Sequence, residues 1–126
     1  MQRSKLLLVD DSQTILMLER LILQADYDII TATDGRTAIA RALAERPDLI
    51  VLDLVMPELD GLQVCEALRR HEATRRTPIL MLTSEVAWAS MKAGYVRGCS
   101  SYLIKPVDGP RLLAKVKRFL RLAGKH

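Results

Sequence analysis

The sequence predicts one α/β domain built on a doubly wound parallel sheet, and three observations support this. Five short apolar runs of strand length recur along the chain, at residues 6–9, 28–33, 49–52, 79–82 and 101–104. The segments between them place apolar residues at helical spacing. The runs themselves are nearly continuously apolar, which is typical of parallel strands covered by helices on both faces. With 126 residues, of which 49% are hydrophobic, the chain is long enough for one core.

Each strand is followed by a segment with helix signals. Ser12 and Asp34 are predicted N-caps of the first two helices, and the second should end before Pro47. Residues 86–96 predict a weaker fourth helix, interrupted at Gly94, and the fifth follows Pro110, a residue that a first helical turn accepts. The apolar positions expected to face the core are Ile15, Leu16, Leu18, Ile22 and Leu23; Ala38, Ile39, Ala42 and Leu43; Leu62, Val64, Cys65 and Leu68; and Leu112, Leu113, Val116, Phe119 and Leu120.

The composition excludes several classes of protein. No uninterrupted apolar run could cross a bilayer, and the one near the amino terminus is too short for a secretory signal. We therefore expect a cytoplasmic protein that does not contact a membrane. Cys65 and Cys99 make neither a disulfide framework nor a metal-ligand set, and are expected to be reduced and near the core. Residues 1–126 should form a single domain without an output domain.

Charge is distributed unevenly along the chain. Residues 1–60 carry six Lys/Arg and eleven Asp/Glu, whereas residues 61–126 carry thirteen and four, which gives the net charge of +4. This asymmetry leaves open a solvated basic face, a docking surface for an acidic partner, and nucleic-acid binding. A solvated face is favoured, because no aromatic or glycine-rich element is interleaved with the basic residues. Direct nucleic-acid binding is not expected, because no helix-turn-helix module follows the fifth helix.

Polar groups follow four of the five predicted strands. Asp10 and Asp11 follow the first, Asp53 the third, Thr83 the fourth and Lys105 the fifth. Ligands of open parallel sheets bind beyond the carboxyl ends of the strands, so these side chains should meet at one edge. Each residue alone has an ordinary structural explanation. Together they predict a functional site.

The chemistry of this set favours phosphoryl transfer. Clustered carboxylates repel one another, and a divalent cation such as Mg²⁺ would offset their charge. One carboxylate could then attack phosphorus and form an acyl phosphate, while Lys105 and Thr83 stabilise the phosphoryl oxygens. Asp10 and Asp11 are adjacent and are interpreted as metal ligands. Asp53 stands alone before a turn and is interpreted as the nucleophile.

The motifs LLLVDD, DLVMPELDG, MLTSE and YLIKP occur in this order, and with them the chain resembles the receiver domain of two-component response regulators. The resemblance implies the chemotaxis-response-regulator-like, flavodoxin-like (βα)5 fold with strand order 2-1-3-4-5. It also implies a signalling protein rather than an enzyme, one that catalyses only its own phosphorylation and dephosphorylation. A sensor histidine kinase or a histidine phosphotransfer protein would be the donor.

The resemblance also implies roles for single residues. Asp53 would be the phosphoacceptor, and Mg²⁺ would be held by Asp11 directly, by Asp10 largely through water, by Asp53, and by the backbone carbonyl of Val55. Thr83 and Lys105 would hold the phosphoryl oxygens.

By the same resemblance, Tyr102 matches the aromatic residue that swings inward as the residue at the Thr83 position shifts toward the phosphoryl group. The alternative is that Tyr102 is a strand residue that only packs. The Lys105–Pro106 bond is commonly cis in this family, and X–Pro bonds are those for which cis is accessible.

The leading hypothesis is a switch in which phosphorylation of Asp53 changes the surface of the fourth helix, fifth strand and fifth helix. A downstream protein would then dock there, on a basic stripe formed by Arg111, Lys115 and Arg118 with Lys117 and Arg121 beside it. A Mg²⁺ phosphohydrolase is disfavoured by Val55, which stands where such enzymes place a second Asp. A pseudo-receiver is disfavoured because every expected polar group is present. A stand-alone regulator is favoured over a receiver cut from a longer protein.

Overall fold

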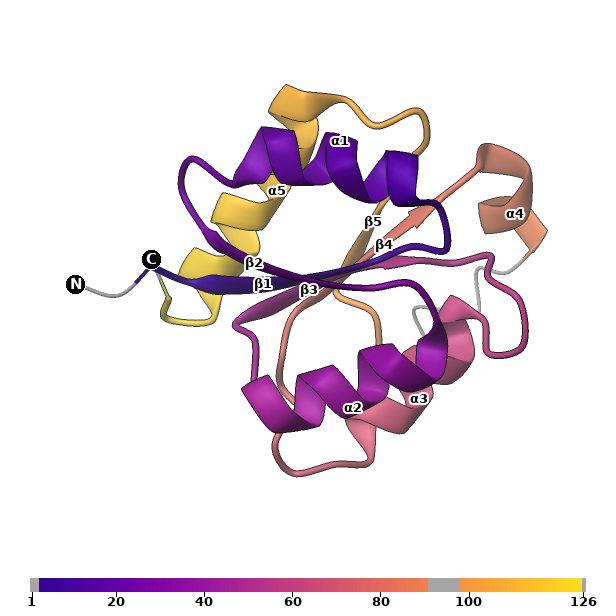
Figure 1. Cartoon of the computed structure of the whole chain (residues 1–126), viewed down its shortest axis with the longest axis horizontal. Helices are drawn as coiled ribbons and strands as arrows, with labels where there is room; N and C mark the ends of the chain where they lie inside the picture. Colours follow the sequence, from indigo (N-terminus) through magenta and orange to yellow (C-terminus); the bar gives the residue numbers. More distant parts are fainter. Residues whose placement is uncertain (1–2, 91–97, 126) are drawn as a thin grey trace.

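The protein was analysed as a computed structural model, which describes residues 3–90 and 98–125 (Figure 1). Within these ranges, strands and helices alternate as β1 (Lys5–Val9), α1 (Gln13–Leu23), β2 (Asp28–Ala32), α2 (Gly35–Glu45), β3 (Leu49–Asp53), α3 (Gly61–Arg69), β4 (Ile79–Thr83), α4 (Glu85–Ser90), β5 (Ser101–Ile104) and α5 (Gly109–Leu122). The predicted alternation of five strands and five helices is confirmed.

The five strands form one parallel sheet in the order β2-β1-β3-β4-β5, as the family resemblance implies. The central strands β1 and β3 pair with Val9 opposite Leu52. At the end of the strand order, β4 pairs with the outermost strand β5, with Thr83 opposite Ile104. This register brings the carboxyl ends of β1, β3, β4 and β5 to one edge of the sheet.

Helices cover both faces of the sheet, with α1 and α5 on one and α2 and α3 on the other (Figure 1). Because side chains alternate along a strand, successive residues enter different cores. Leu6 and Leu8 of β1 pack in the cluster under α1 and α5, whereas Leu7 and Val9 pack in the cluster under α2 and α3. The all-buried strands β3 and β4 explain the continuous apolar runs of the sequence.

The predicted helix starts are confirmed at two positions. The Ser12 hydroxyl accepts a hydrogen bond from the Ile15 amide at 3.3 Å, and an Asp34 carboxylate oxygen accepts one from the Thr37 amide at 2.8 Å. Helix α5 begins at Gly109, before the proline used to predict it, because Asp108 caps it.

The expected inward face of α1 is wrong at one position. Leu18 is 47% exposed, and the buried stripe of this helix is Leu16, Glu19 and Leu23, at the i, i+3, i+7 spacing of one helix face. The sequence pattern favoured leucine over glutamate, but packing on the sheet selects the face by geometry.

Other expectations concern single features. Cys65 and Cys99 are buried and are not joined in a disulfide, and the Lys105–Pro106 peptide is cis. Of the predicted fourth helix, the structure describes only the part up to Ser90, so Gly94 lies outside the described residues. In the described ranges, no helix is both long and apolar enough to span a membrane.

Candidate functional site

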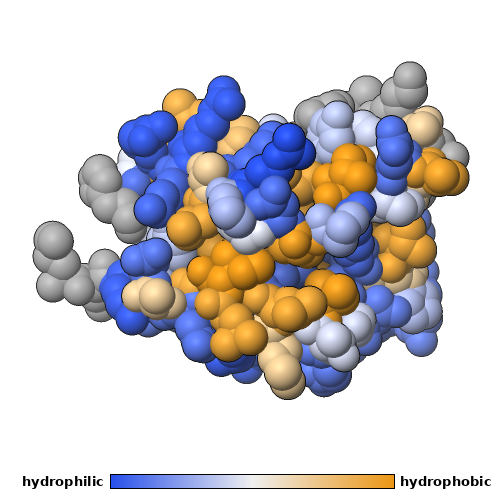
Figure 2. Space-filling view, turned by 90° about the horizontal axis from the view of Figure 1, so that it is seen from above, coloured by the Kyte–Doolittle hydropathy of each residue, from blue (hydrophilic) through white to orange (hydrophobic). Residues whose placement is uncertain are grey.

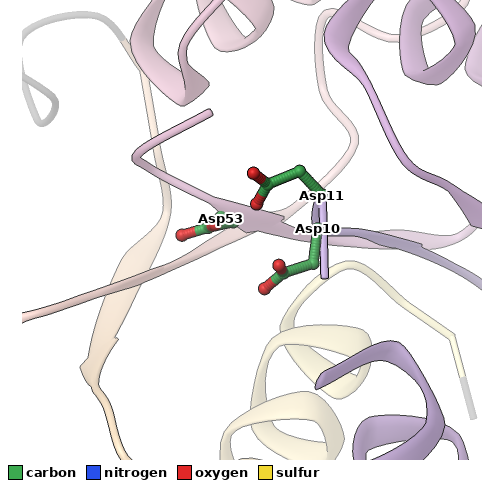
Figure 3. A group of neighbouring side chains, drawn as sticks. All are labelled: Asp10, Asp11 and Asp53. Atoms are coloured by element: carbon green, nitrogen blue, oxygen red, sulfur yellow. The ribbon is translucent and has the colours of Figure 1, made fainter. Parts of the chain in front are cut away.

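Three carboxylates meet at the carboxyl edge of the sheet. Asp10 and Asp11 directly follow β1, and Asp53 is the last residue of the neighbouring strand β3. One oxygen from each lies within 4.8 Å of the others, and the three carboxylates extend in the same direction, with that of Asp53 between those of Asp11 and Asp10 (Figure 3). The structure therefore brings together Asp11 and Asp53, which are 42 positions apart in the sequence.

Lys105 completes this cluster. Its ammonium nitrogen lies 3.2 Å from Asp10 Oδ2 and 3.2 Å from Asp53 Oδ1. Asp10 also accepts a hydrogen bond from the Ser12 amide at 2.9 Å, and Asp53 accepts one from the Val55 amide at 3.4 Å. The backbone turns after β1 and β3 thus fix both carboxylates, while Lys105 bridges them.

The charges of the site are incompletely balanced. Burial raises the pKa of Asp53, and the neighbouring Asp10 carboxylate raises it further, while Lys105 opposes the shift. Burial alone would lower the pKa of Lys105, but the carboxylates of Asp53 and Asp10 raise it above its ordinary value. One cation facing three carboxylates leaves an excess of negative charge, which an additional cation would offset.

The donor set fits a hard divalent cation. Carboxylate oxygens are the ligands that Mg²⁺ prefers, and its usual protein sites contribute only one or two carboxylates plus waters. Asp11 is exposed, so the cluster has an open side where water and a phosphate group can enter.

Thr83 ends β4 at the same edge but is held differently. Its side chain is 1% exposed, and its hydroxyl donates to the Ser84 carbonyl at 3.2 Å. Its own carbonyl accepts from the Lys105 amide at 2.7 Å, which ties the end of β4 to the residue after β5. The predicted site residues therefore share one edge, but the Thr83 hydroxyl does not contact the carboxylates in this state.

Gly61 backs the end of β3. A Cβ atom at this position would lie 2.6 Å from the Asp53 carbonyl oxygen and 2.8 Å from Leu54 Cα. Only a residue without a side chain allows α3 to approach the end of β3 so closely.

Glu19 is a buried carboxyl that sequence reasoning missed. It is 0% exposed, and among the described residues its two carboxylate oxygens are the buried side-chain polar atoms without a hydrogen-bond partner. Burial raises its pKa to about 8, and the charge of Asp10 acts in the same direction. A glutamate inside a predicted amphipathic helix carries no signal that would have identified it.

Tyr102 also has a partner that the sequence did not reveal. Its ring stacks on Trp88 of α4, with centroids 3.9 Å apart and planes inclined by 17°. The two residues are separated by a segment that includes undescribed positions, so no local pattern connects them.

An apolar surface borders the site on the α1 side. The exposed side chains of Met17, Leu18 and Leu21 contribute to a hydrophobic area on the face formed by α1 and α5 (Figure 2). A pocket of about 350 Å³ opens there between α1 and the segment after β5. Its lining residues are Ile15, Leu18, Leu21, Ile22, Lys105, Pro106 and Val107.

The basic residues of α5 do not all behave alike. Arg111, Lys117, Arg118 and Arg121 are exposed. Lys115 instead donates from its ammonium to the buried Ser101 hydroxyl at 2.6 Å, and burial lowers its pKa. It links α5 to β5.

Comparisons with known proteins agree with this geometry. The sequence model of the family "Response regulator receiver domain" matches residues 6–117. The chain is 42% identical over 118 residues to the Alkaline phosphatase synthesis transcriptional regulatory protein PhoP of Bacillus subtilis, covering 93% of the chain and 48% of PhoP. It is 36% identical to Protein PilG of Pseudomonas aeruginosa, covering 90% of the chain and 84% of PilG.

A solved structure supports the same assignment. The chemotaxis protein CheY4 of Vibrio cholerae superposes with a TM-score of 0.87 at 37% identity, covering 93% of the chain and 98% of CheY4. The chain spans about half the length of several curated relatives that it matches, among them PhoP.

Proposed function

Because the chain belongs to the response regulator receiver family, we propose that it is a phosphorylation switch in which Asp53 accepts a phosphoryl group. The observation that carries this proposal is the bridge made by Lys105, whose ammonium lies 3.2 Å from both Asp10 and Asp53. A cation at this distance from the nucleophile lies where the negative charge of a transferring phosphoryl group has to be stabilised.

The proposed reaction is an in-line displacement. A carboxylate oxygen of Asp53 attacks the phosphorus atom of a phosphohistidine, the P–N bond breaks, and the electron pair leaves with the imidazole nitrogen, which takes up a proton. The product is an acyl phosphate on Asp53. The ammonium of Lys105 pairs with one phosphoryl oxygen, and the Thr83 hydroxyl donates a hydrogen bond to another phosphoryl oxygen.

Asp10, Asp11, Asp53 and the Val55 carbonyl are the proposed Mg²⁺ ligands. When bound, Mg²⁺ offsets the charge of the carboxylates and of the incoming phosphoryl oxygens. The exposed Val55 side chain lies two residues after Asp53, where a second Asp would be needed to hydrolyse external substrates, so we propose no phosphohydrolase activity.

We propose that the phosphodonor docks on the apolar surface of α1. This surface lies beside Lys105, and Leu18 and Leu21 line the adjoining pocket. A protein donor that buries these side chains would bring its phosphohistidine to the open side of the carboxylates. A sensor histidine kinase or a histidine phosphotransfer protein has the required chemistry.

The proposed output is the face formed by α4, β5 and α5, which would engage a downstream protein. Exposed Arg111 and Arg118 favour an acidic partner. Tyr102 is the proposed switch residue of this face.

The test is incubation of the protein with Mg²⁺ and a small acyl-phosphate donor, read by intact mass. We expect one labile phosphoryl adduct that is absent from Asp53→Asn. An adduct that persists in this variant, or no adduct in the parent, would overturn the proposal.

A further inference from the structure

The stacked rings of Trp88 and Tyr102 join α4 to β5. Their centroids lie 3.9 Å apart, and both side chains pack against the hydrophobic cluster under α2 and α3. Trp88 is the single tryptophan of the chain. The contact therefore connects two elements of the proposed output face. Because no other tryptophan is present, the fluorescence of Trp88 reports on this contact.

Hydrogen bonds connect this stack to the candidate site through one carbonyl group. The Ser84 carbonyl accepts from the Thr83 hydroxyl at 3.2 Å and from the Trp88 amide at 2.9 Å. Thr83 can donate to a phosphoryl oxygen only if its hydroxyl leaves this carbonyl, because a hydroxyl has one proton to donate. The rearrangement would occur at the carbonyl that starts the first turn of α4.

The backbone that carries the other ring belongs to the sheet and not to α4. Tyr102 lies within β5, paired with Met81 of β4, and the Lys105 amide bonds to the Thr83 carbonyl. Movement of the Thr83–Ser84 segment therefore changes the position of Trp88 relative to the Tyr102 backbone, which the sheet holds, and an inward turn of the Tyr102 ring would separate the pair further. The energy of an aromatic pair depends on how the two rings are placed, with offset-stacked and edge-to-face arrangements preferred, so such a displacement changes the energy of this pair.

We propose that the Trp88–Tyr102 stack is an autoinhibitory contact, which holds α4 against β5 while Asp53 is unmodified and opens when Asp53 is phosphorylated. This inference rests on the proposed function and adds the contact that opposes the switch. A stack that exists only in the unmodified state favours that state over the phosphorylated one.

The magnitude follows from the strength of an aromatic pair. Removing one ring should shift the equilibrium toward the open state by roughly two- to tenfold. Because the open state places the Thr83 hydroxyl for the phosphoryl group, the rate of phosphorylation by a small donor should rise by the same factor.

The first experiment measures tryptophan emission of the full chain during phosphorylation with Mg²⁺ and a small acyl-phosphate donor, with adduct formation followed by intact mass. We expect emission to change in step with the adduct, and to stay constant in Asp53→Asn. An adduct with unchanged emission would overturn the autoinhibitory contact and leave the proposed function intact. Absence of an adduct in the parent would overturn the proposed function itself.

The second experiment compares phosphorylation rates of Trp88→Leu and the parent. Val86→Leu is the matched control, because Val86 is 78% exposed on the same helix and is not part of the stack. We expect faster phosphorylation of Trp88→Leu only. Tyr102→Leu removes the same stack from the strand side, so it serves if Trp88→Leu does not fold. Rates equal to the parent in the folded variant would refute the inference.

Discussion

The ammonium of Lys105 lies 3.2 Å from Asp53 Oδ1. This contact joins the last residue of β3 to the residue that follows β5 and precedes the cis peptide bond. The same ammonium lies 3.2 Å from Asp10 Oδ2, so one cation holds two carboxylates that are almost completely buried. Stability and reactivity of the site are therefore linked through Lys105.

Replacing Lys105 should leave those carboxylates uncompensated. We expect Lys105→Ala to lower the free energy of unfolding by about 1–3 kcal/mol, less than for a fully buried pair because Lys105 is partly exposed. Urea unfolding measures this change. Adding Asp53→Asn to Lys105→Ala should recover part of the lost free energy of unfolding, because it removes one buried carboxylate that no longer has a cation beside it. A double variant no more stable than Lys105→Ala would contradict the linkage.

The buried carboxyl of Glu19 should make stability depend on pH. Its pKa is raised from 4.5 to about 8, so between these values the folded protein holds a proton that the unfolded chain has released. The contribution of Glu19 to stability is therefore fully present below the lower value and is lost as the pH rises, by at most about 1.4 kcal/mol per pH unit.

Glu19→Leu and Glu19→Gln test this prediction by urea unfolding over that pH range. Both substitutions should flatten the decline, because neither side chain ionises. The raised pKa of Asp53 contributes a slope of the same sign, which should persist in both variants. A parent curve with the same slope as both variants would show that Glu19 titrates alike in the folded and unfolded chains.

Magnesium should stabilise the fold through the carboxylate cluster. A ligand that binds only the folded state at a hundredfold excess over its Kd adds about 2.7 kcal/mol. We expect the thermal midpoint to rise with Mg²⁺ concentration, and to rise much less in Asp11→Asn. Asp26→Asn, at an exposed position between α1 and β2, is the matched control and should retain the full response. An equal response in Asp11→Asn would exclude this residue as a ligand.

The apolar surface of α1 should matter for a protein donor but not for a small one. Leu21→Glu places a charge on a side chain that is 62% exposed and lines the pocket beside Lys105. We expect phosphotransfer from a phosphohistidine donor protein to slow by about tenfold, the effect of losing about 1.4 kcal/mol of binding. Phosphorylation by a small acyl phosphate should remain unchanged.

Leu122→Glu provides the control for that experiment, since Leu122 is 68% exposed at the end of α5. Equal slowing by both substitutions would indicate a general charge effect instead of docking on α1.

The close approach of Gly61 to β3 predicts that a side chain at position 61 would lower both the stability of the fold and the rate of phosphorylation. In Gly61→Ala the new methyl group would meet the Asp53 carbonyl and Leu54 Cα, both backbone atoms that cannot rotate away. We expect a loss of about 1–3 kcal/mol of stability together with slower phosphorylation. Gly109→Ala should be tolerated, because its nearest contact would be Ile22 at 3.5 Å. Normal phosphorylation of a stable Gly61→Ala would contradict the role of this contact.

The fold could be predicted because its signals are local. The apolar runs, the caps Ser12 and Asp34, and the polar residues that follow four of the predicted strands all lie within a few positions of the element they define. The gathering of Asp10, Asp53 and Lys105 followed from the parallel sheet, whose carboxyl ends share an edge.

What the sequence could not reveal depends on packing between distant segments. The burial of Glu19 in place of Leu18 is decided by how α1 rotates on the sheet, and the Trp88–Tyr102 contact by how α4 lies against β5. The hydrogen bond from the Lys115 ammonium to the Ser101 hydroxyl, which joins one side chain of the predicted basic stripe to β5, is likewise a contact between distant segments. The roles assigned to Asp53, Thr83, Tyr102 and the Val55 carbonyl stay predictions.

The alternation of side chains along the strands divides the predicted site residues between the two faces of the sheet. Counting from the two cores, Asp10, Asp53 and Lys105 fall on the α1/α5 side of the sheet, whereas Thr83 and Tyr102 fall on the opposite side. Of the proposed output face, the Trp88–Tyr102 pair therefore lies across the sheet from α1, whereas α5 lies on the same side as α1. A donor still bound over α1 does not cover the aromatic pair, so we expect a target to engage the protein before its donor departs.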